Sequence, residues 1–296
     1  NLQAKGYLEF APEATVWAGK RFYQRHDIHI IDSKYWNVSG YGVGVENVAL
    51  DGGALSAAII RGDGDEYVTD TTDGSDYNVY FLDTRYAFKP IDNSWAEIGI
   101  DYAITNPTDV QKEAGIELDN GVMLTGEFGY GFSFGWNKLV VQYGDKGLAQ
   151  NMVSQGGGWY DIWQSDYEKA SQATGYRIIA TGDINVTDHF LIDHVITYGY
   201  AQDHKDWVDD EQMFSVVARP TYAWSDYNKT SLELGYFTDT KTWDSGSETK
   251  TGGSKITLAQ SFTAGKEFLA RPELRFYVSY LKDAENQSFN DSTDDN

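Results

Sequence analysis

One short segment of the sequence concentrates side chains that could do chemistry. Its central residues include Arg25, Asp27, His29 and Asp32. His26 and His29 are three residues apart, a spacing that can bring two imidazoles to one metal ion. The segment has no regular periodicity and no third ligand nearby, so this is a weak metal signal. A salt bridge between Arg25 and Asp27 within a loop is the simplest alternative.

The glycines that follow this segment superficially resemble a dinucleotide-binding loop. Gly40, Gly42 and Gly44 alternate with other residues, but a G-x-G-x-x-G motif would require glycine at Val45. Turns or close packing of the backbone account for them better. The sequence also lacks H-E-x-x-H and P-loop motifs. Its many carboxylates would permit a glycosidase, yet nothing places any pair of them at a catalytic separation.

The composition excludes several classes of protein. The 296 residues include 23 Lys plus Arg and 45 Asp plus Glu, a net charge of −22, which would repel nucleic acid. Aromatic residues make up 15%, too many for a disordered acidic chain. Without cysteine, this stretch has no disulfide scaffold, thiolate zinc site or cysteine nucleophile. No window approaches the roughly 18 apolar residues of a membrane helix, but hydropathy does not separate a soluble β protein from a membrane β-barrel.

Alternation of apolar and polar residues recurs from end to end and predicts strands. The runs lie at 82–88, 96–104, 122–128, 139–143, 176–181, 192–200, 214–224, 232–236, 256–262 and 274–280. Helical periodicity is weak, with 164–172 as the one candidate. The elements that position the segment around Arg25–Asp32 are therefore expected to be strands.

The predicted connections between these strands alternate in length. Short turns are expected at 89–93 and 185–188, and long acidic loops at 62–78, 150–174, 203–212 and 239–254. This alternation is typical of up-and-down outer-membrane barrels. Aromatic residues late in the runs fit interfacial girdles: Tyr198, Tyr200, Tyr222, Trp224, Tyr236 and Tyr280. A soluble β-sandwich remains the alternative on pattern alone.

The run GKRFYQRHD-x-H-x-x-D, followed by YW and SG-x-G-x-G-x-EN, starts at Gly19 and is long and specific. It closely resembles the maltoporin family, the trimeric maltodextrin-selective porins of Gram-negative outer membranes. Residues 137–143, 146–148, 255–260 and 270–272 also match the family pattern. The resemblance covers essentially the whole chain, weakly in the long loops.

The resemblance implies an all-β fold, an antiparallel up-and-down transmembrane β-barrel of about 18 strands in full-length members. Residues 1–5 look like a strand well inside the family sequence, and 285–296 look like an outer loop that precedes a closing strand. We therefore expect residues 1–296 to form a single partial barrel domain of roughly 14 strands. An inward-folded constriction loop is expected around 25–44.

The resemblance also implies roles for individual residues. The polar track at the constriction would contain Arg25, Asp27, His29 and Asp32. Trp136 falls at an aromatic position of the sugar slide, although without the resemblance a girdle or core residue would be the simpler interpretation. Two positions depart from the family pattern. Lys34 occupies the position where the family has the central constriction tyrosine, and Leu269, next to Phe268, occupies the position of a slide tryptophan.

These observations predict a porin for facilitated diffusion of maltose and maltodextrins, with no catalysis, cofactor, metal or nucleic-acid partner. The resemblance implies a homotrimer in outer-membrane lipid of a Gram-negative cell, with outer loops that could serve as phage receptors. Lys34 and Leu269 favour a first alternative, a porin of the same family tuned to another saccharide. A secreted β-sheet carbohydrate-binding protein or glycosidase is the alternative from a different class.

Overall fold

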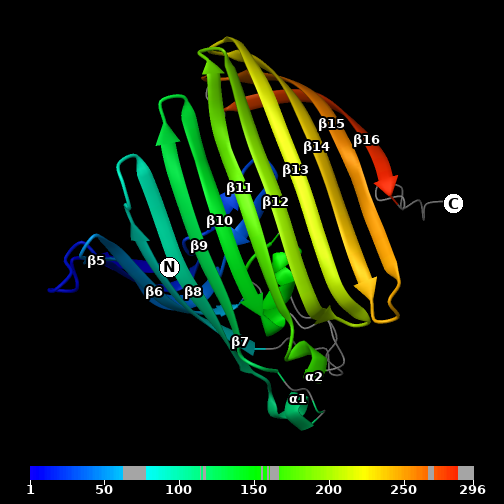
Figure 1. The fold of residues 1–296 in the computed structure, drawn as a ribbon. Helices are drawn as coiled ribbons and strands as arrows, with labels where there is room; N and C mark the ends of the chain where they lie inside the picture. Colours follow the sequence, from blue (N-terminus) through cyan, green and yellow to red (C-terminus); the bar gives the residue numbers. More distant parts are fainter. Residues whose placement is uncertain are drawn as a thin grey trace.

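The dominant element of the molecule is one large antiparallel sheet (Figure 1). The computed structural model describes residues 1–62, 78–113, 115, 118–154, 156–158, 160, 167–265 and 270–285. Within them the sheet has 14 strands in the order β1-β2-β5-β6-β7-β8-β9-β10-β11-β12-β13-β14-β15-β16. Apart from one inserted hairpin between β2 and β5, each strand therefore pairs with its neighbour in sequence.

The strands from β11 to β15 are the longest, and in the described part of the chain three short helices lie between strands. The sheet contains β1 (Leu2–Lys5), β2 (Thr15–Arg21), β5 (Gly40–Leu50), β6 (Gly53–Gly62), β7 (Asn78–Phe88), β8 (Ser94–Asn106), β9 (Gly121–Phe132), β10 (Gly135–Asp145), β11 (Thr174–Thr187), β12 (Phe190–Lys205), β13 (Val208–Ser225), β14 (Asn228–Trp243), β15 (Glu248–Thr263) and β16 (Glu273–Glu285). The helices are α1 (Asp109–Glu113), the 3₁₀ helix η1 (Lys146–Met152) and α2 (Tyr167–Ala170). In the described part of the chain, no helix is long and apolar enough to cross a membrane.

The two faces of the sheet have opposite polarity, because successive side chains of a strand point to opposite sides. On β8, Ile98 and Ile100 are exposed on what we call the outer face, whereas Asp101 is fully buried on the inner face. The pattern repeats on β7, where Leu82 is exposed and Arg85 is buried. A polar inside and an apolar outside are typical of a transmembrane barrel wall, not of a soluble sandwich.

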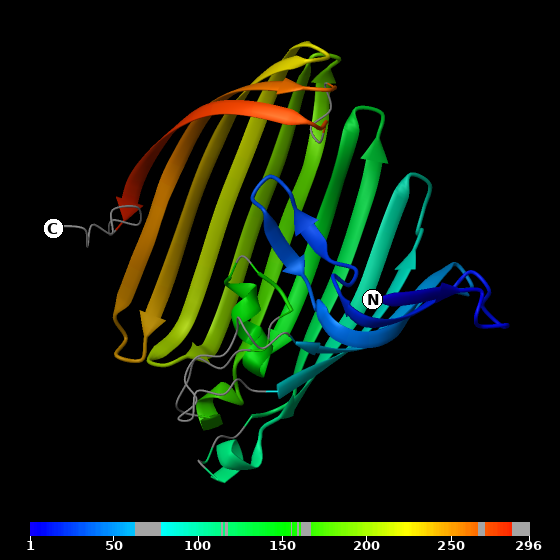
Figure 2. The same cartoon turned by 180° about the vertical axis from the view of Figure 1, so that it is seen from behind.

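The hairpin β3 (His26–Ile28) and β4 (Ser33–Trp36) lies on the concave inner side of the curved sheet, as do the helices that follow β10 (Figure 2). The two strands form a separate sheet. Within the described residues the large sheet stays open, with β1 and β16 as its edges. The inner side that holds the hairpin is called the lumen below.

The predicted strands are confirmed, since every run lies within a strand of the large sheet. Two predicted long loops are wrong. Residues 203–212 contain only a tight turn, because β12 extends to Lys205 and β13 begins at Val208. Residues 239–254 likewise belong mostly to strands, because β14 ends at Trp243 and β15 begins at Glu248. Their polar composition suggested loops, but strand pairing uses backbone hydrogen bonds and tolerates polar side chains outside an apolar layer.

The remaining predictions have mixed outcomes. The helix α2 lies within the predicted 164–172, whereas α1 and η1 were not predicted. Residues 63–77 and 286–296, together with Phe268 and Leu269, lie outside the described residues. The glycines at 40–44 belong to β5, not to the hairpin, and a Cβ on Gly42 would lie 2.3 Å from the carbonyl oxygen of Ile59. Close packing of β5 on β6 is therefore the reason for these glycines.

Candidate functional site

A buried arginine on β7 fixes the base of the hairpin to the wall. The Arg85 guanidinium lies 2.8 Å from the carboxylate of Asp83 and donates a hydrogen bond of 2.6 Å to the carbonyl of Gln24. It also stacks 3.9 Å from the ring centroid of Trp36, whose indole donates to Asp101 at 2.8 Å. Since Arg85, Asp83 and Trp36 are at most 1% exposed, this contact is a dry, charged core between hairpin and sheet.

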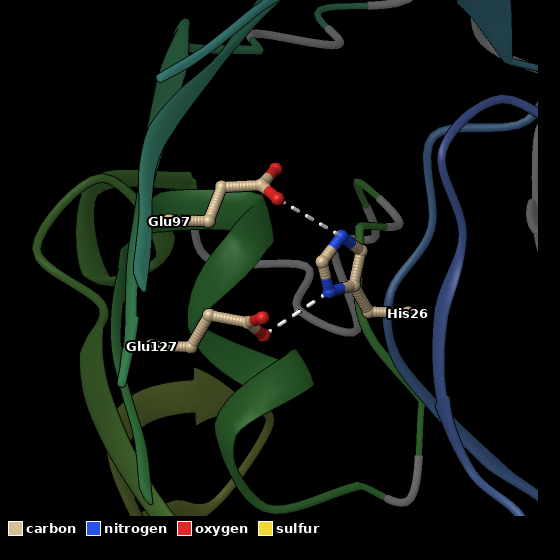
Figure 3. Close-up of side chains that lie close together, drawn as sticks. All are labelled: His26, Glu97 and Glu127. Carbon is tan, nitrogen blue, oxygen red and sulfur yellow. Dashed lines mark hydrogen bonds and ion pairs between the residues drawn. The ribbon is translucent and has the colours of Figure 1, made fainter. Parts of the chain in front are cut away.

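A second cluster holds Tyr35 and His26 against β8, β9 and β10. The Tyr35 hydroxyl donates to Glu127 at 2.6 Å and accepts from Lys138 at 2.5 Å. Figure 3 shows the His26 ring between two carboxylates, with Nδ1 3.1 Å from Glu127 and Nε2 3.6 Å from Glu97. Burial raises the pKa of Tyr35, and the negative charge of Glu127 raises it further, so the phenol stays protonated and remains a donor.

The trio of His26, Glu97 and Glu127 also has a composition that could hold a metal ion. The geometry suits ion pairing better, because the two ring nitrogens of His26 face different carboxylates (Figure 3). A single metal ion could bind only one of the two nitrogens. The Lys138 ammonium, 3.5 Å from Glu127, further opposes a cation there. Sequence spacing gave no signal for this trio, because its members lie on three separate strands.

Arg177 on β11 ties the hairpin to the segment that follows η1. Its guanidinium donates to the carbonyls of Ser154 at 2.8 Å, Gly156 at 2.7 Å and Tyr35 at 3.1 Å. It also donates to the side chain of Gln142, which in turn donates to the Tyr35 carbonyl at 2.9 Å. Carbonyl and amide oxygens thus take the place of water around this fully buried cation. Tyr35 is held at its backbone carbonyl by Arg177 and Gln142, and at its hydroxyl by Glu127 and Lys138.

The tip of the hairpin reaches the opposite part of the sheet. Arg219 on β13 donates to the carbonyl of Ile30 at 3.0 Å. At the turn, Lys34 pairs with Asp32 at 2.9 Å, and this hydrogen bond holds the pKa of Asp32 below its usual range. Asp32 adopts a left-handed backbone with φ of 51°. The hairpin therefore contacts the inner face of the sheet at β7–β9 near its base and at β13 near its tip.

The structure brings some of the predicted site residues together and separates others. Asp27, His29 and Trp136 line one cavity of about 300 Å³ at the side of the hairpin. Arg25 lies in a different pocket, with its guanidinium 4.6 Å from the ring centroid of Phe22. His29 and Asp32 line a third and larger cavity at the tip.

One aromatic residue of this region was not anticipated from the sequence. Trp95 on β8 is 38% exposed, and its ring centroid lies 6.1 Å from that of Trp136. Strand register places both rings on the inner face. Trp95 pairs with Gly129, Gly129 pairs with Lys138, and Trp136 lies two residues before Lys138 on the same strand. The available signal was its position directly before the alternating run 96–104, whose alternation, extended by one residue, would have assigned the face of Trp95.

A family model described as LamB porin matches residues 1–296. This chain belongs to the LamB porin family. It is 53% identical over 300 residues to Maltoporin 1 of Aeromonas salmonicida, covering 100% of this chain and 69% of that relative. It is 50% identical to Maltoporin 2 of Yersinia pestis (99% and 70% covered) and 48% identical to Maltoporin 1 of Klebsiella pneumoniae (100% and 70% covered).

Membership of this family confirms the resemblance seen in the sequence. LamB porins are channel proteins, so the chain is a porin of a transport family and not one of an enzyme family. The alternative of a secreted carbohydrate-binding protein or glycosidase loses its support, because the outer face is apolar and the family is one of porins.

Proposed function

We propose that this porin carries maltose and maltodextrins across a Gram-negative outer membrane by facilitated diffusion past the hairpin. The observation that carries the proposal is the cavity that places the ring of Trp136 beside Asp27 and His29. A maltodextrin has apolar sugar faces and hydroxyl edges, and such a cavity offers partners for both. The names of the maltoporin relatives support the same substrate class.

In this proposal, sugar faces stack on the Trp136–Trp95 pair while hydroxyls exchange hydrogen bonds with the polar track. Arg25, Asp27, His29 and Asp32 form that track along the hairpin, with Lys34 beside Asp32 near the tip. Charge-assisted hydrogen bonds are stronger than neutral ones, so few are needed at each point. Several weak contacts in series let the sugar leave as readily as it enters.

The apolar outer face supports residence in outer-membrane lipid. Near the end of β13, Tyr222 and Trp224 are exposed on that face with ring centroids 4.6 Å apart, as expected of an interfacial girdle. A homotrimer and a role for outer loops as phage receptors remain predictions from the family resemblance.

Removing the Trp136 ring tests the proposal directly. In the full-length protein reconstituted in planar bilayers, Trp136→Ala is expected to weaken block of ion current by maltohexaose about fivefold, because one stacking contact contributes on the order of 1 kcal/mol. Trp95→Ala is expected to act in the same direction. Trp136→Phe, which keeps a ring, serves as the control and should stay near wild type. A wild-type channel that maltohexaose does not block would refute the proposed substrate.

Lys34 offers a gain-of-affinity test at the hairpin tip. We expect Lys34→Tyr to tighten maltodextrin block by about fivefold, since a ring adds stacking contact on the order of 1 kcal/mol. Lys34→Gln removes the same charge from Asp32 without adding a ring, and should not tighten block. Equal effects of the two variants, or weaker block by Lys34→Tyr, would contradict a sugar path along this tip.

A further inference from the structure

The inner face of β13–β16, together with the segment just before β16, carries a cluster of basic side chains, which we call the basic wall. Its members are Arg219, Lys255, Arg271 and Arg275. Strand register explains their common face, because Glu233 on β14 pairs with Thr257, and Thr257 with Ser279. Lys255 lies two residues before Thr257, and Arg275 lies four before Ser279, so both share the inner face.

The carboxylates of the basic wall are too few for its cations. Glu233 is shared by Arg219 and by Lys255, the latter at 3.0 Å. Glu273 is likewise shared by Arg271 at 3.2 Å and Arg275 at 2.9 Å. Both carboxylates are nearly buried, whereas the side chains of Lys255, Arg271 and Arg275 are 40–58% exposed. Four cations against two carboxylates leave an excess of two positive charges that faces the lumen.

Neighbouring charges do not cancel this excess. Asp193 on β12 lies opposite Arg219 in register, and Lys229 lies on β14, on the other side of β13. Asp193 and Lys229 interact electrostatically and contribute one charge of each sign, so together they leave the excess unchanged. Across the cavity, Asp32 is already paired with Lys34. The opposite part of the sheet holds the carboxylates Asp83, Glu97, Asp101 and Glu127. In a chain of net charge −22, a positive wall in the lumen is therefore a local feature with a definite position.

A space of suitable size lies between the basic wall and the hairpin tip. The cavity has a volume of about 700 Å³ and is lined by the basic wall, by His29 and Asp32 of the tip, and by hydroxyl groups such as Ser231 and Thr257. Tyr277 on β16 adds a ring on the same side. A group of sugar size with a negative charge would meet cations, hydroxyls and a ring together.

We propose that the basic wall is a binding site for anionic saccharides, sugars that carry a carboxylate or a phosphate. Guanidinium groups bind both anions with two parallel hydrogen bonds, and Arg271 and Arg275 each have N–H groups beyond those that reach Glu273. The proposal rests on the proposed sugar-channel function and extends its substrate range beyond neutral maltodextrins. In this proposal the basic wall binds the charged group of an anionic sugar, whereas neutral sugar rings stack on Trp136 in the other cavity.

Matched sugars that differ only in charge test the site. Maltobionate and maltitol are open-chain derivatives of one disaccharide that differ by a carboxylate in place of a hydroxymethyl group. In planar bilayers of the full-length protein we expect maltobionate to block ion current about fivefold more strongly than maltitol. Maltose 1-phosphate against maltose gives the phosphate arm, and the comparison of the two arms shows which anion the wall prefers.

Variants assign the effect to the wall. Arg275→Gln and, separately, Lys255→Gln should abolish the preference for the anionic sugar, shift ion selectivity toward cations and leave maltitol block unchanged. Lys282→Gln removes a positive charge from the opposite face of β16 and should preserve the preference. Equal block by maltobionate and maltitol in the wild type, or an unchanged preference in both wall variants, would overturn the site. Failure of neutral maltohexaose to block would instead refute the proposed function.

Discussion

Arg85→Leu is expected to release the base of the hairpin and to lower the free energy of unfolding by about 3–5 kcal/mol, because it leaves the buried Asp83 carboxylate without its partner. The variant also loses the hydrogen bond to the Gln24 carbonyl and the stack on Trp36. The lumen should widen as the hairpin detaches. Single-channel conductance and denaturant unfolding of the full-length protein in lipid vesicles measure the two effects.

A double variant separates charge from packing. In Asp83→Leu/Arg85→Leu both members of the ion pair are apolar, and such replacements are often close to neutral in stability. We therefore expect stability to recover substantially while conductance stays high, since the link to Gln24 is still missing. If the double variant regained normal conductance, Arg85 would not hold the hairpin through that carbonyl. If Arg85→Leu left conductance unchanged, the hairpin would be held elsewhere.

Gly99→Val is expected to push Trp36 out of its place and to detach the same end of the hairpin. A Cβ on Gly99 would lie 2.6 Å from two atoms of the Trp36 ring and 2.8 Å from the carbonyl oxygen of Thr84. Trp36 is fully buried, so it has no free space to move into. Overpacking of this kind costs about 1–3 kcal/mol, and conductance should rise together with current noise.

The adjacent strand provides the matched control. Gly126 on β9 lies on the outer face, and a Cβ there would meet its nearest atom, in Ile98, at 4.0 Å. Gly126→Val makes the same chemical change in the same sheet without touching the hairpin, and its conductance should equal that of the wild type. Equal conductance changes in both variants would mean that sheet distortion, not displacement of Trp36, is the cause.

Most of the sheet could be predicted from the sequence, because alternation and turn residues are local signals. The run at 96–104 defines β8, and the pairing of consecutive strands follows from up-and-down order. The ends of β12 to β15 could not be predicted, since the polar residues around Trp207 and Trp243 resemble loop composition. What extends these strands is backbone pairing with neighbours, which side-chain polarity does not report.

The candidate site was predictable only where a family motif covers it. The expected constriction site had six members, of which Asp27, His29 and Trp136 line one cavity, whereas Arg25 lies in another pocket. Their role in sugar binding stays a proposal. Trp95 and the basic wall were not anticipated, because their members become neighbours only through register across several strands. Register is the pairing of individual residues between neighbouring strands, and a single sequence does not show which residues pair.

The contacts of the hairpin also set an order of events in folding. Its partners lie far ahead in the chain: 61 residues separate Gln24 from Arg85, 92 separate Tyr35 from Glu127, and 189 separate Ile30 from Arg219. Loop-closure entropy opposes such distant contacts until the intervening strands have paired. We therefore expect the hairpin to dock only after β7–β13 have paired, so that a wide bore precedes the narrow section of the channel.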